Sequence, residues 1–224
     1  MAEALAAMSV MLKTIPLFSI LGGEELEAIS QLAVTKNYPK NSVIINEGDQ
    51  TDSLYVILSG KVKVFLTDDQ QREVIVAIQR EGDYFGELAL LDEEPRSASV
   101  MTMEPSTMLM IAKSAFERYL ASNPKIAISL MRGLTQRLRV TTENVKSLAL
   151  MDVYGRIART LLQLGKEDDG RYVIGEKLTH QDLANMVGAS REMVSRIMKD
   201  LTKGGYITVE GRQMFIKEKL PHGW

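Results

Sequence analysis

The sequence contains no cysteine, and this absence removes several kinds of chemistry at once. Disulfide bonds, thiolate metal sites, cysteine nucleophiles and cysteine-ligated iron–sulfur clusters are all excluded. Long apolar runs are missing too, since none approaches the roughly 18 residues that a membrane-spanning helix requires. Residues 1–16 do not have the pattern of a signal peptide, because Glu3 precedes any basic residue. We therefore expect a cytoplasmic protein without membrane spans.

The sequence also offers no pairing of a nucleophile with a base and no cluster of metal ligands. We expect neither catalytic residues nor a metal site, and hence no enzyme. What is present is ordinary: 45% hydrophobic and 25% charged residues, typical of a globular protein. The 224 residues suffice for one large domain or two small ones, and a net charge of −2 does not by itself indicate a nucleic-acid partner.

Residues 125–151 carry the strongest periodic pattern. Apolar residues alternate in steps of three and four, as in the a and d positions of a coiled coil. The pattern predicts a long dimerisation helix with a narrow apolar seam. Thr141 occupies one seam position and Thr142 adjoins it, and a hydroxyl in an apolar seam destabilises it unless something bonds to it. We expect a ligand to do so. The apolar positions are Met131, Leu134, Leu138, Val145 and Leu148.

The first part of the chain is predicted to be β-rich. Helical periodicity extends over residues 9–37, and after Tyr38 the hydrophobic period changes to two. Short strands rich in β-branched residues follow at near-regular spacing, which favours an antiparallel barrel or jelly roll. We expect them at residues 43–45, 54–58, 62–66, 74–78, 97–103 and 107–111, with a short helix at 114–122.

One segment, residues 85–100, departs from this rhythm. Gly86 opens a short helix-like piece whose free N–H groups could hold an anion. Arg96 and Ser97 follow ten and eleven residues later, and both suit a phosphate oxygen. Glu87 would repel a phosphate, so it is better placed to accept hydrogen bonds from sugar hydroxyls.

This segment resembles the phosphate-binding cassette of cyclic-nucleotide-binding domains, since its Phe-Gly-Glu-Leu-Ala-Leu and Pro-Arg-Ser-Ala elements have the same spacing. The resemblance implies that Glu87 bonds the ribose 2′-hydroxyl and that Arg96 pairs with the cyclic phosphate. It also implies that Ser97 and the backbone at Gly86 and Leu88 complete the phosphate cradle. The loop before Arg96 matches the kinase regulatory-subunit pattern better than that of the best-known bacterial receptor.

A second motif occupies residues 179–199. Thr179 can cap a helix that stops at Gly188, and Ser190 can cap another almost at once. Two short helices joined by a glycine turn predict a helix-turn-helix, whose second helix enters the major groove of DNA. Strands at 206–209 and 213–216 would form a wing. The candidate DNA-binding residues are Ser190, Arg191, Glu192, Ser195, Arg196 and Lys199.

The Ser-Arg-Glu-x-Val-x-Arg string, together with residues 137–145 and 150–158, resembles the cyclic-AMP receptor protein family of bacterial transcription regulators over essentially the whole chain. The resemblance implies that Thr141 and Thr142 read the adenine of cyclic AMP, one from each subunit. It also implies a palindromic DNA site with TGTGA-type half-sites. The connection at 165–177 is shorter than the family's polymerase-contacting surface, so an RNA polymerase contact is expected by a route that the sequence leaves open.

The expected fold class is therefore α+β. A cyclic-nucleotide-binding β-roll would occupy residues 1–124, a coiled-coil dimerisation helix 125–151, and a winged helix-turn-helix 152–224. The expected function is a homodimeric, cyclic-AMP-responsive regulator that binds double-stranded DNA. Two alternatives stay open: the same DNA reader with another ligand, such as cyclic di-GMP, or with none, and a nucleotide-binding regulatory subunit that does not read DNA.

Overall fold

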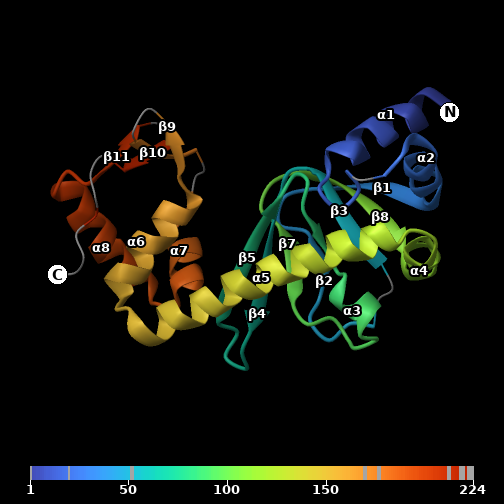
Figure 1. Ribbon diagram of the computed structural model, residues 1–224. Coiled ribbons are helices and arrows are strands. Elements are labelled where there is room, and N and C mark those ends of the chain that lie inside the picture. The colour runs from blue at the N-terminus through green and yellow to red at the C-terminus, as the bar shows by residue number, and fades with distance from the viewer. Residues whose placement is uncertain are drawn as a thin grey trace. The chain divides into compact units, whose positions relative to one another are not determined.

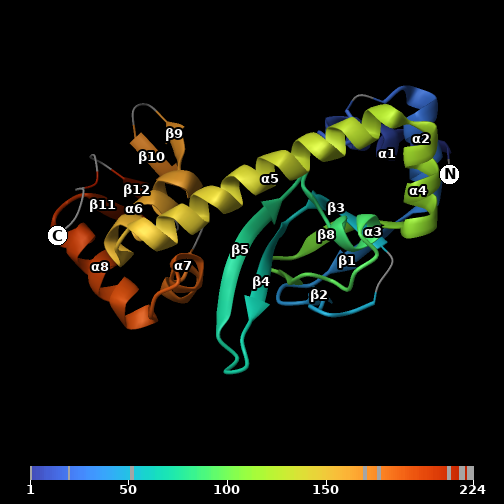
Figure 2. The same ribbon diagram turned by 60° about the horizontal axis from the view of Figure 1, so that its bottom comes forward.

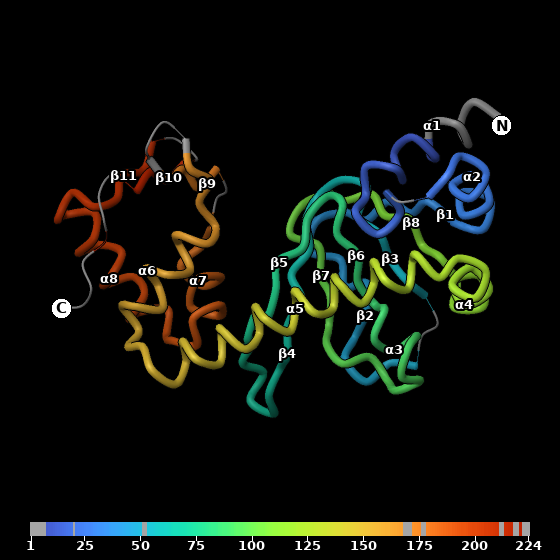
Figure 3. Tube along the Cα trace, in the orientation of Figure 1, coloured from blue at the N-terminus to red at the C-terminus, as the bar shows by residue number. Residues whose placement is uncertain are grey.

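The computed structural model describes residues 2–19, 21–50, 53–168, 171–175, 178–210, 213–216 and 220. It divides the chain into two compact units, and each is described by itself. The first contains residues 1–71 and 76–138, and the second contains residues 72–75 and 139–224. The boundary falls within the long helix α5 (Pro124–Leu150), which is continuous along the trace in Figure 3.

The first unit is built on two four-stranded sheets with antiparallel pairing (Figure 1). One sheet has the order β1 (Ala33–Tyr38), β8 (Ser106–Ala112), β3 (Ser53–Ser59) and β6 (Tyr84–Phe85). The other has the order β2 (Val43–Ile45), β7 (Ser99–Thr102), β4 (Lys61–Thr67) and β5 (Glu73–Arg80). The predicted β-roll is confirmed.

Strand β3 is almost entirely apolar, because both of its faces are buried. Side chains alternate across a strand. Leu54 and Val56 join a core formed with the helices, whereas Tyr55 and Ile57 join a second core between the two sheets. The helices of the first core are α1 (Ala2–Thr14), α2 (Gly23–Leu32), α4 (Lys113–Ser122) and the start of α5, which gather at one end of the sheets in Figure 2.

Two local expectations were wrong. Helical periodicity was expected through residue 37, but α2 ends at Leu32 and the chain continues as β1, paired with β8 from Ala33 opposite Ile111. Long-range pairing with β8 therefore outweighs the local pattern. No strand was expected directly after Gly165, but residues 166–168 form strand β9 (Lys166–Asp168), paired with β10 (Arg171–Ile174).

The second unit contains the predicted winged helix-turn-helix. Helices α6 (Val153–Leu164), α7 (His180–Val187) and α8 (Arg191–Lys203) pack on one core with a sheet of order β11-β12-β10-β9. Strands β11 (Ile207–Glu210) and β12 (Gln213–Ile216) pair from Ile207 opposite Ile216, as a wing requires. The turn expected at residues 211–212 lies outside the described residues. Among the described helices, none combines the length and apolar character needed to cross a membrane.

Candidate functional site

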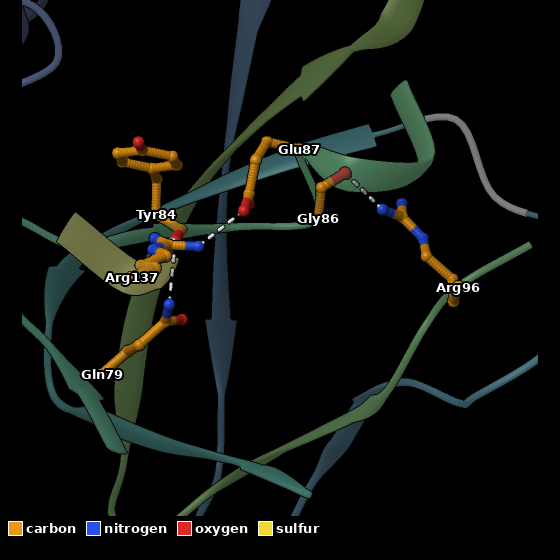
Figure 4. Close-up of polar contacts among 6 residues, drawn as sticks. All are labelled: Gln79, Tyr84, Gly86, Glu87, Arg96 and Arg137. Atoms are coloured by element: carbon orange, nitrogen blue, oxygen red, sulfur yellow. Dashed lines mark hydrogen bonds and ion pairs between the residues drawn. The ribbon is translucent and has the colours of Figure 1, made fainter. Parts of the chain in front are cut away.

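The cassette segment holds Arg96 in a buried position. Arg96 is 3% exposed, and its Nη1 donates to the carbonyl oxygen of Gly86 at 2.6 Å (Figure 4). Its Nη2 donates to the carbonyl oxygen of Ser53 at 2.7 Å. Gly86 has a φ of +86°, and a Cβ there would lie 2.6 Å from Arg96 Nη1. The glycine therefore allows both the left-handed backbone and the approach of the guanidinium. These two bonds fix the position of the guanidinium.

Glu87 is also buried, with 2% of its surface exposed. It lies just before the short helix α3 (Leu88–Leu91), and its Oε1 accepts a hydrogen bond of 2.6 Å from Nη1 of Arg137 on α5. Arg137 also donates to the Tyr84 carbonyl oxygen, and its guanidinium lies 4.6 Å from the centre of the Tyr84 ring (Figure 4). Glu87 thus pairs with the guanidinium of Arg137, whereas the guanidinium of Arg96 is held by the backbone at Gly86 and Ser53. These charged groups form a largely buried cluster, which suits an anionic ligand with a hydroxyl group.

The close packing of α5 on this cluster depends on Gly133. A Cβ at Gly133 would lie 2.2 Å from the Tyr84 hydroxyl oxygen, so a larger residue would require either the Tyr84 side chain or the helix to shift. Gly133 precedes Arg137 by one helical turn, which places both on the same face of α5. The glycine therefore lets the guanidinium of Arg137 reach Glu87.

The helix-turn-helix of the second unit is capped as predicted. The Thr179 hydroxyl accepts from the Asp182 N–H at 3.0 Å, and the Asp182 carboxylate accepts from the Thr179 N–H, which forms a capping box. Gly188 ends α7 with a φ of 63°. Ser190 then caps α8 by accepting from the Met193 N–H at 3.2 Å. These caps fix where the second helix starts.

Helix α8 has one buried and one exposed face. Val194, Met198 and Leu201 lie in the core, and the candidate DNA-binding residues Arg191, Glu192, Arg196 and Lys199 are exposed. Ser195 is half-buried, and its hydroxyl shares a hydrogen bond of 2.7 Å with His180 Nδ1 on α7. The exposed face is thus polar and carries three positive side chains, as a groove-reading helix requires.

Arg156 connects the helix-turn-helix to the end of α5. Its Nη1 donates to the Met151 carbonyl at 2.9 Å, and its Nε donates to the Val187 carbonyl at 2.7 Å. Asp152 caps α6 by accepting from the Gly155 N–H at 2.7 Å. The turn between the reader helices is therefore tied directly to the junction between α5 and α6.

Comparison with known proteins matches each of the two parts of the chain to a domain family. Residues 35–123 match the model of the cyclic nucleotide-binding domain, and residues 155–219 match the Crp-like helix-turn-helix domain. The chain is 35% identical over 208 residues to the CRP-like cAMP-activated global transcriptional regulator of Mycobacterium tuberculosis, covering 89% of this chain and 92% of that protein. The chain belongs to the Crp family of transcriptional regulators.

Other members of the Crp family show the same breadth of similarity. The cAMP-activated global transcriptional regulator CRP of Salmonella typhimurium is 36% identical over 186 residues, 80% of this chain and 87% of that protein. Among solved structures, the c-di-GMP responsive global regulator CLP of Xanthomonas campestris has a TM-score of 0.76 and 26% identity, over 88% of this chain and all of that one. The family consists of transcription regulators and not of enzymes. Within the described residues, no group of three or more metal-ligating side chains could hold a metal ion.

The structure brings together only some of the residues expected to hold the nucleotide. Gly86, Glu87 and Arg96 lie in the buried cluster: Arg96 donates to the Gly86 carbonyl, and Glu87, next to Gly86 in the chain, accepts from Arg137. Leu88 and Ser97 are exposed. Thr141 and Thr142 are exposed on the part of α5 that belongs to the second unit, and they are described only there.

Sequence reasoning missed Arg137 altogether. It lies outside the apolar seam of α5, and nothing in the linear spacing distinguishes it from Arg132 or Arg139. Both of these are exposed, whereas Arg137 is half-buried. Arg137 differs from the other two arginines because α5 packs against Tyr84 at its position. Its burial is therefore the signal that identifies it, and that signal comes from the tertiary structure.

The protonation of Glu87 gives a first testable prediction. Burial raises the pKa of the Glu87 carboxyl above its ordinary value of 4.5, although the neighbouring Arg137 opposes this shift. An acid with a raised pKa holds its proton more tightly in the folded state. Its contribution to stability is therefore complete below pH 4.5 and is lost as the pH rises through the folded-state pKa.

We therefore expect the free energy of unfolding of the wild type, relative to Glu87→Gln, to fall as the pH rises above 4.5. Urea unfolding of both proteins at a series of pH values measures this difference. A difference that instead grows with pH would mean that the attraction of Arg137 outweighs burial.

Proposed function

We propose that this protein is a homodimeric transcription regulator that binds cyclic AMP in the β-roll and palindromic DNA through α8. The observation that carries the proposal is the buried cluster of Glu87, Arg96 and Arg137 on the same chain as an exposed, basic reader helix. Residues 1–124, 125–151 and 152–224 would serve as the nucleotide-binding, dimerisation and DNA-binding parts. Such a regulator works in the cytoplasm.

The ligand is assigned by charge and hydrogen bonding. The two guanidinium groups of the cluster suit the negative charge of a cyclic phosphodiester, and its carboxylate suits a hydroxyl group. Arg96, Ser97 and the backbone of Gly86 and Leu88 would hold the phosphate, and Glu87 would accept from the ribose 2′-hydroxyl. Thr141 and, from the second subunit, Thr142 would bond the adenine. The names of the relatives, which are cAMP-activated, support the same ligand.

Dimerisation is proposed from the seam of α5. Met131, Leu138, Val145 and Leu148 are between 53% and 67% exposed in the single chain. Exposed apolar residues at heptad spacing are stabilised when a second helix of the same pattern covers them. A second copy of this chain is the occupant that presents the same seam, and a two-fold dimer would pair them.

The ligand would act by favouring one arrangement of the two α5 helices. Contacts to Thr141 and to the partner chain exist only when the helices are correctly registered, so cyclic AMP binds that state more tightly. A coupling free energy of about 1–3 kcal/mol is typical. Arg156 and Asp152 would transmit the register of α5 to the reader, because they tie the helix-turn-helix to its end. The two copies of α8 would then lie about 34 Å apart, one DNA turn.

Two experiments test the function. Calorimetric titration with cyclic AMP, cyclic GMP and cyclic di-GMP is expected to show binding of cyclic AMP with the highest affinity. A gel shift on a TGTGA palindrome is expected to show a protein–DNA complex whose affinity increases when cyclic AMP is added. A protein that bound a nucleotide but shifted no palindromic DNA would instead be a regulatory subunit. RNA polymerase is the further partner proposed on that DNA.

A second ligand is favoured by one comparison. The structure of CLP from Xanthomonas campestris is that of a c-di-GMP responsive regulator, and it matches this chain at a TM-score of 0.76. Cyclic di-GMP carries two phosphodiesters, so a single cluster of this charge would leave one phosphate without a partner. Tighter binding of cyclic di-GMP than of cyclic AMP in the same titration would replace the first ligand by the second.

Reading of DNA by α8 gives the second prediction. Arg191→Ala is expected to weaken binding to the best palindrome by about 1–3 kcal/mol and to relax the preference at one base position, because arginine can bond guanine with two donors. Binding to a set of sites with each base changed in turn measures both effects. Lys199→Ala is the matched control, since loss of a phosphate contact weakens all sites evenly and lowers the salt dependence. An Arg191→Ala protein that still discriminates every base would disprove the role.

A further inference from the structure

Gln79 is a buried polar residue inside the β-roll that the proposed function has not used. It lies on β5 four residues after Ile75, so the two side chains point to the same face of the strand. Ile75 is 5% exposed and Gln79 is 7% exposed. An amide at an inward position next to an apolar residue is costly to bury unless both its ends are hydrogen-bonded.

The orientation of the Gln79 amide is fixed by its partner. Its Nε2 donates to the Tyr84 carbonyl oxygen at 3.2 Å (Figure 4). A carbonyl oxygen can only accept, so the nitrogen must face Tyr84 and Oε1 must point elsewhere. Oε1 is buried and has no hydrogen-bond partner within the part of the chain that the structure describes. Native proteins rarely leave such an acceptor unsatisfied, and each case calls for an explanation.

The surroundings of Gln79 indicate what satisfies it. The Tyr84 carbonyl that receives Gln79 Nε2 also receives Arg137, which in turn bonds Glu87. Figure 4 shows Gln79 bonded to the Tyr84 carbonyl and Glu87 bonded to the guanidinium of Arg137, which bonds the same carbonyl. Gln79 therefore belongs to the polar cluster assigned to the nucleotide, although it comes from another strand. Its free Oε1 would be satisfied by a hydrogen-bond donor of that ligand.

We propose that Gln79 Oε1 accepts a hydrogen bond from the exocyclic amino group of the bound purine and thereby contributes to base specificity. This inference rests on the proposed binding of a cyclic nucleotide. A cyclic 3′,5′-nucleotide carries few donors, because its phosphate offers only acceptors and its 3′ and 5′ oxygens are esterified. The 2′-hydroxyl is assigned to Glu87, and the amino group of adenine remains.

The test compares two ligands on two proteins. Wild type and Gln79→Leu are titrated with cyclic AMP and with the cyclic monophosphate of purine riboside, which lacks the 6-amino group. We expect the preference of the wild type for cyclic AMP to fall about tenfold in Gln79→Leu, the loss of about one hydrogen bond. The Tyr84 carbonyl keeps Arg137 as its donor, so the substitution leaves no new unsatisfied group there.

Two controls make the outcome specific. The loss of affinity for 2′-deoxy cyclic AMP relative to cyclic AMP reports on Glu87, and it is expected to be the same in both proteins. Urea unfolding verifies that Gln79→Leu is folded. An unchanged preference between the two ligands would mean that a buried water satisfies Oε1, and it would overturn this inference alone. A wild type that bound no cyclic nucleotide would overturn the proposed function as well.

Discussion

Replacing Leu138 and Val145 together by glutamate is expected to convert the protein from a dimer into a monomer. Both residues lie on the seam of α5, and they are 67% and 61% exposed in the single chain. In a two-fold dimer each glutamate would face apolar side chains and the like charges of the second copy, which destabilises the pairing. Because a dimer gains affinity by binding two half-sites at once, binding to a palindrome is expected to weaken by about 100-fold or more.

Sedimentation velocity over a range of concentrations measures the dimer, and a gel shift measures DNA binding. Gln136→Glu combined with Val140→Glu is the matched control. It adds the same charge to exposed positions of the same helix outside the seam, and it is expected to remain dimeric. If the seam variant sedimented as the wild type does, the proposed interface would be wrong, whatever the result for the nucleotide.

Arg96→Leu is expected to abolish most of the binding of cyclic AMP. Removing one partner of a buried, charge-assisted contact costs about 2–5 kcal/mol, which corresponds to roughly 30-fold or more in affinity. The side chain is 3% exposed, so water cannot easily replace it at the phosphate. The same substitution removes the donors of the Gly86 and Ser53 carbonyls, and a decrease in the free energy of unfolding is expected as well.

Arg96→Lys separates binding from folding, because lysine keeps the charge but lacks the two-pronged geometry of the guanidinium. We expect it to bind cyclic AMP with an affinity between those of the wild type and Arg96→Leu. Calorimetry measures the affinities, and circular dichroism verifies the fold. A folded Arg96→Leu protein that bound cyclic AMP as tightly as the wild type would place the phosphate elsewhere.

Much of the fold could be predicted because local patterns and long-range packing agree. Periods of two and of 3.6 residues, with glycine and threonine at the ends of elements, gave the strands of the β-roll and the helix-turn-helix. The exceptions are two short strands. Residues 33–38 form β1 because β8, about seventy residues later in the chain, pairs with them, and their own helical pattern gives no sign of this pairing. Residues 166–168 form β9 because they pair with the neighbouring strand β10, although their charged sequence does not have the pattern of a strand.

The residues of the candidate site also fall into those that the sequence predicted and those that it did not. Gly86, Glu87 and Arg96 could be predicted because the cassette is contiguous and its spacing is specific. Arg137 and Gln79 could not, since one lies fifty residues after Glu87 and the other on a separate strand, and neither belongs to a motif. Gly133 gave no signal either, because its role is to leave space for the Tyr84 hydroxyl.

The sequence by itself determined the family pattern, the order of most elements and the ends of the two helices of the helix-turn-helix, and it gave the candidate residues for phosphate and base contacts. It could do so because these depend on neighbours within a few residues. The tertiary structure alone decided which arginine of α5 pairs with Glu87 and which buried amide has an unused acceptor. Those outcomes depend on how closely a helix and two strands approach one another, and that distance is set by the whole core.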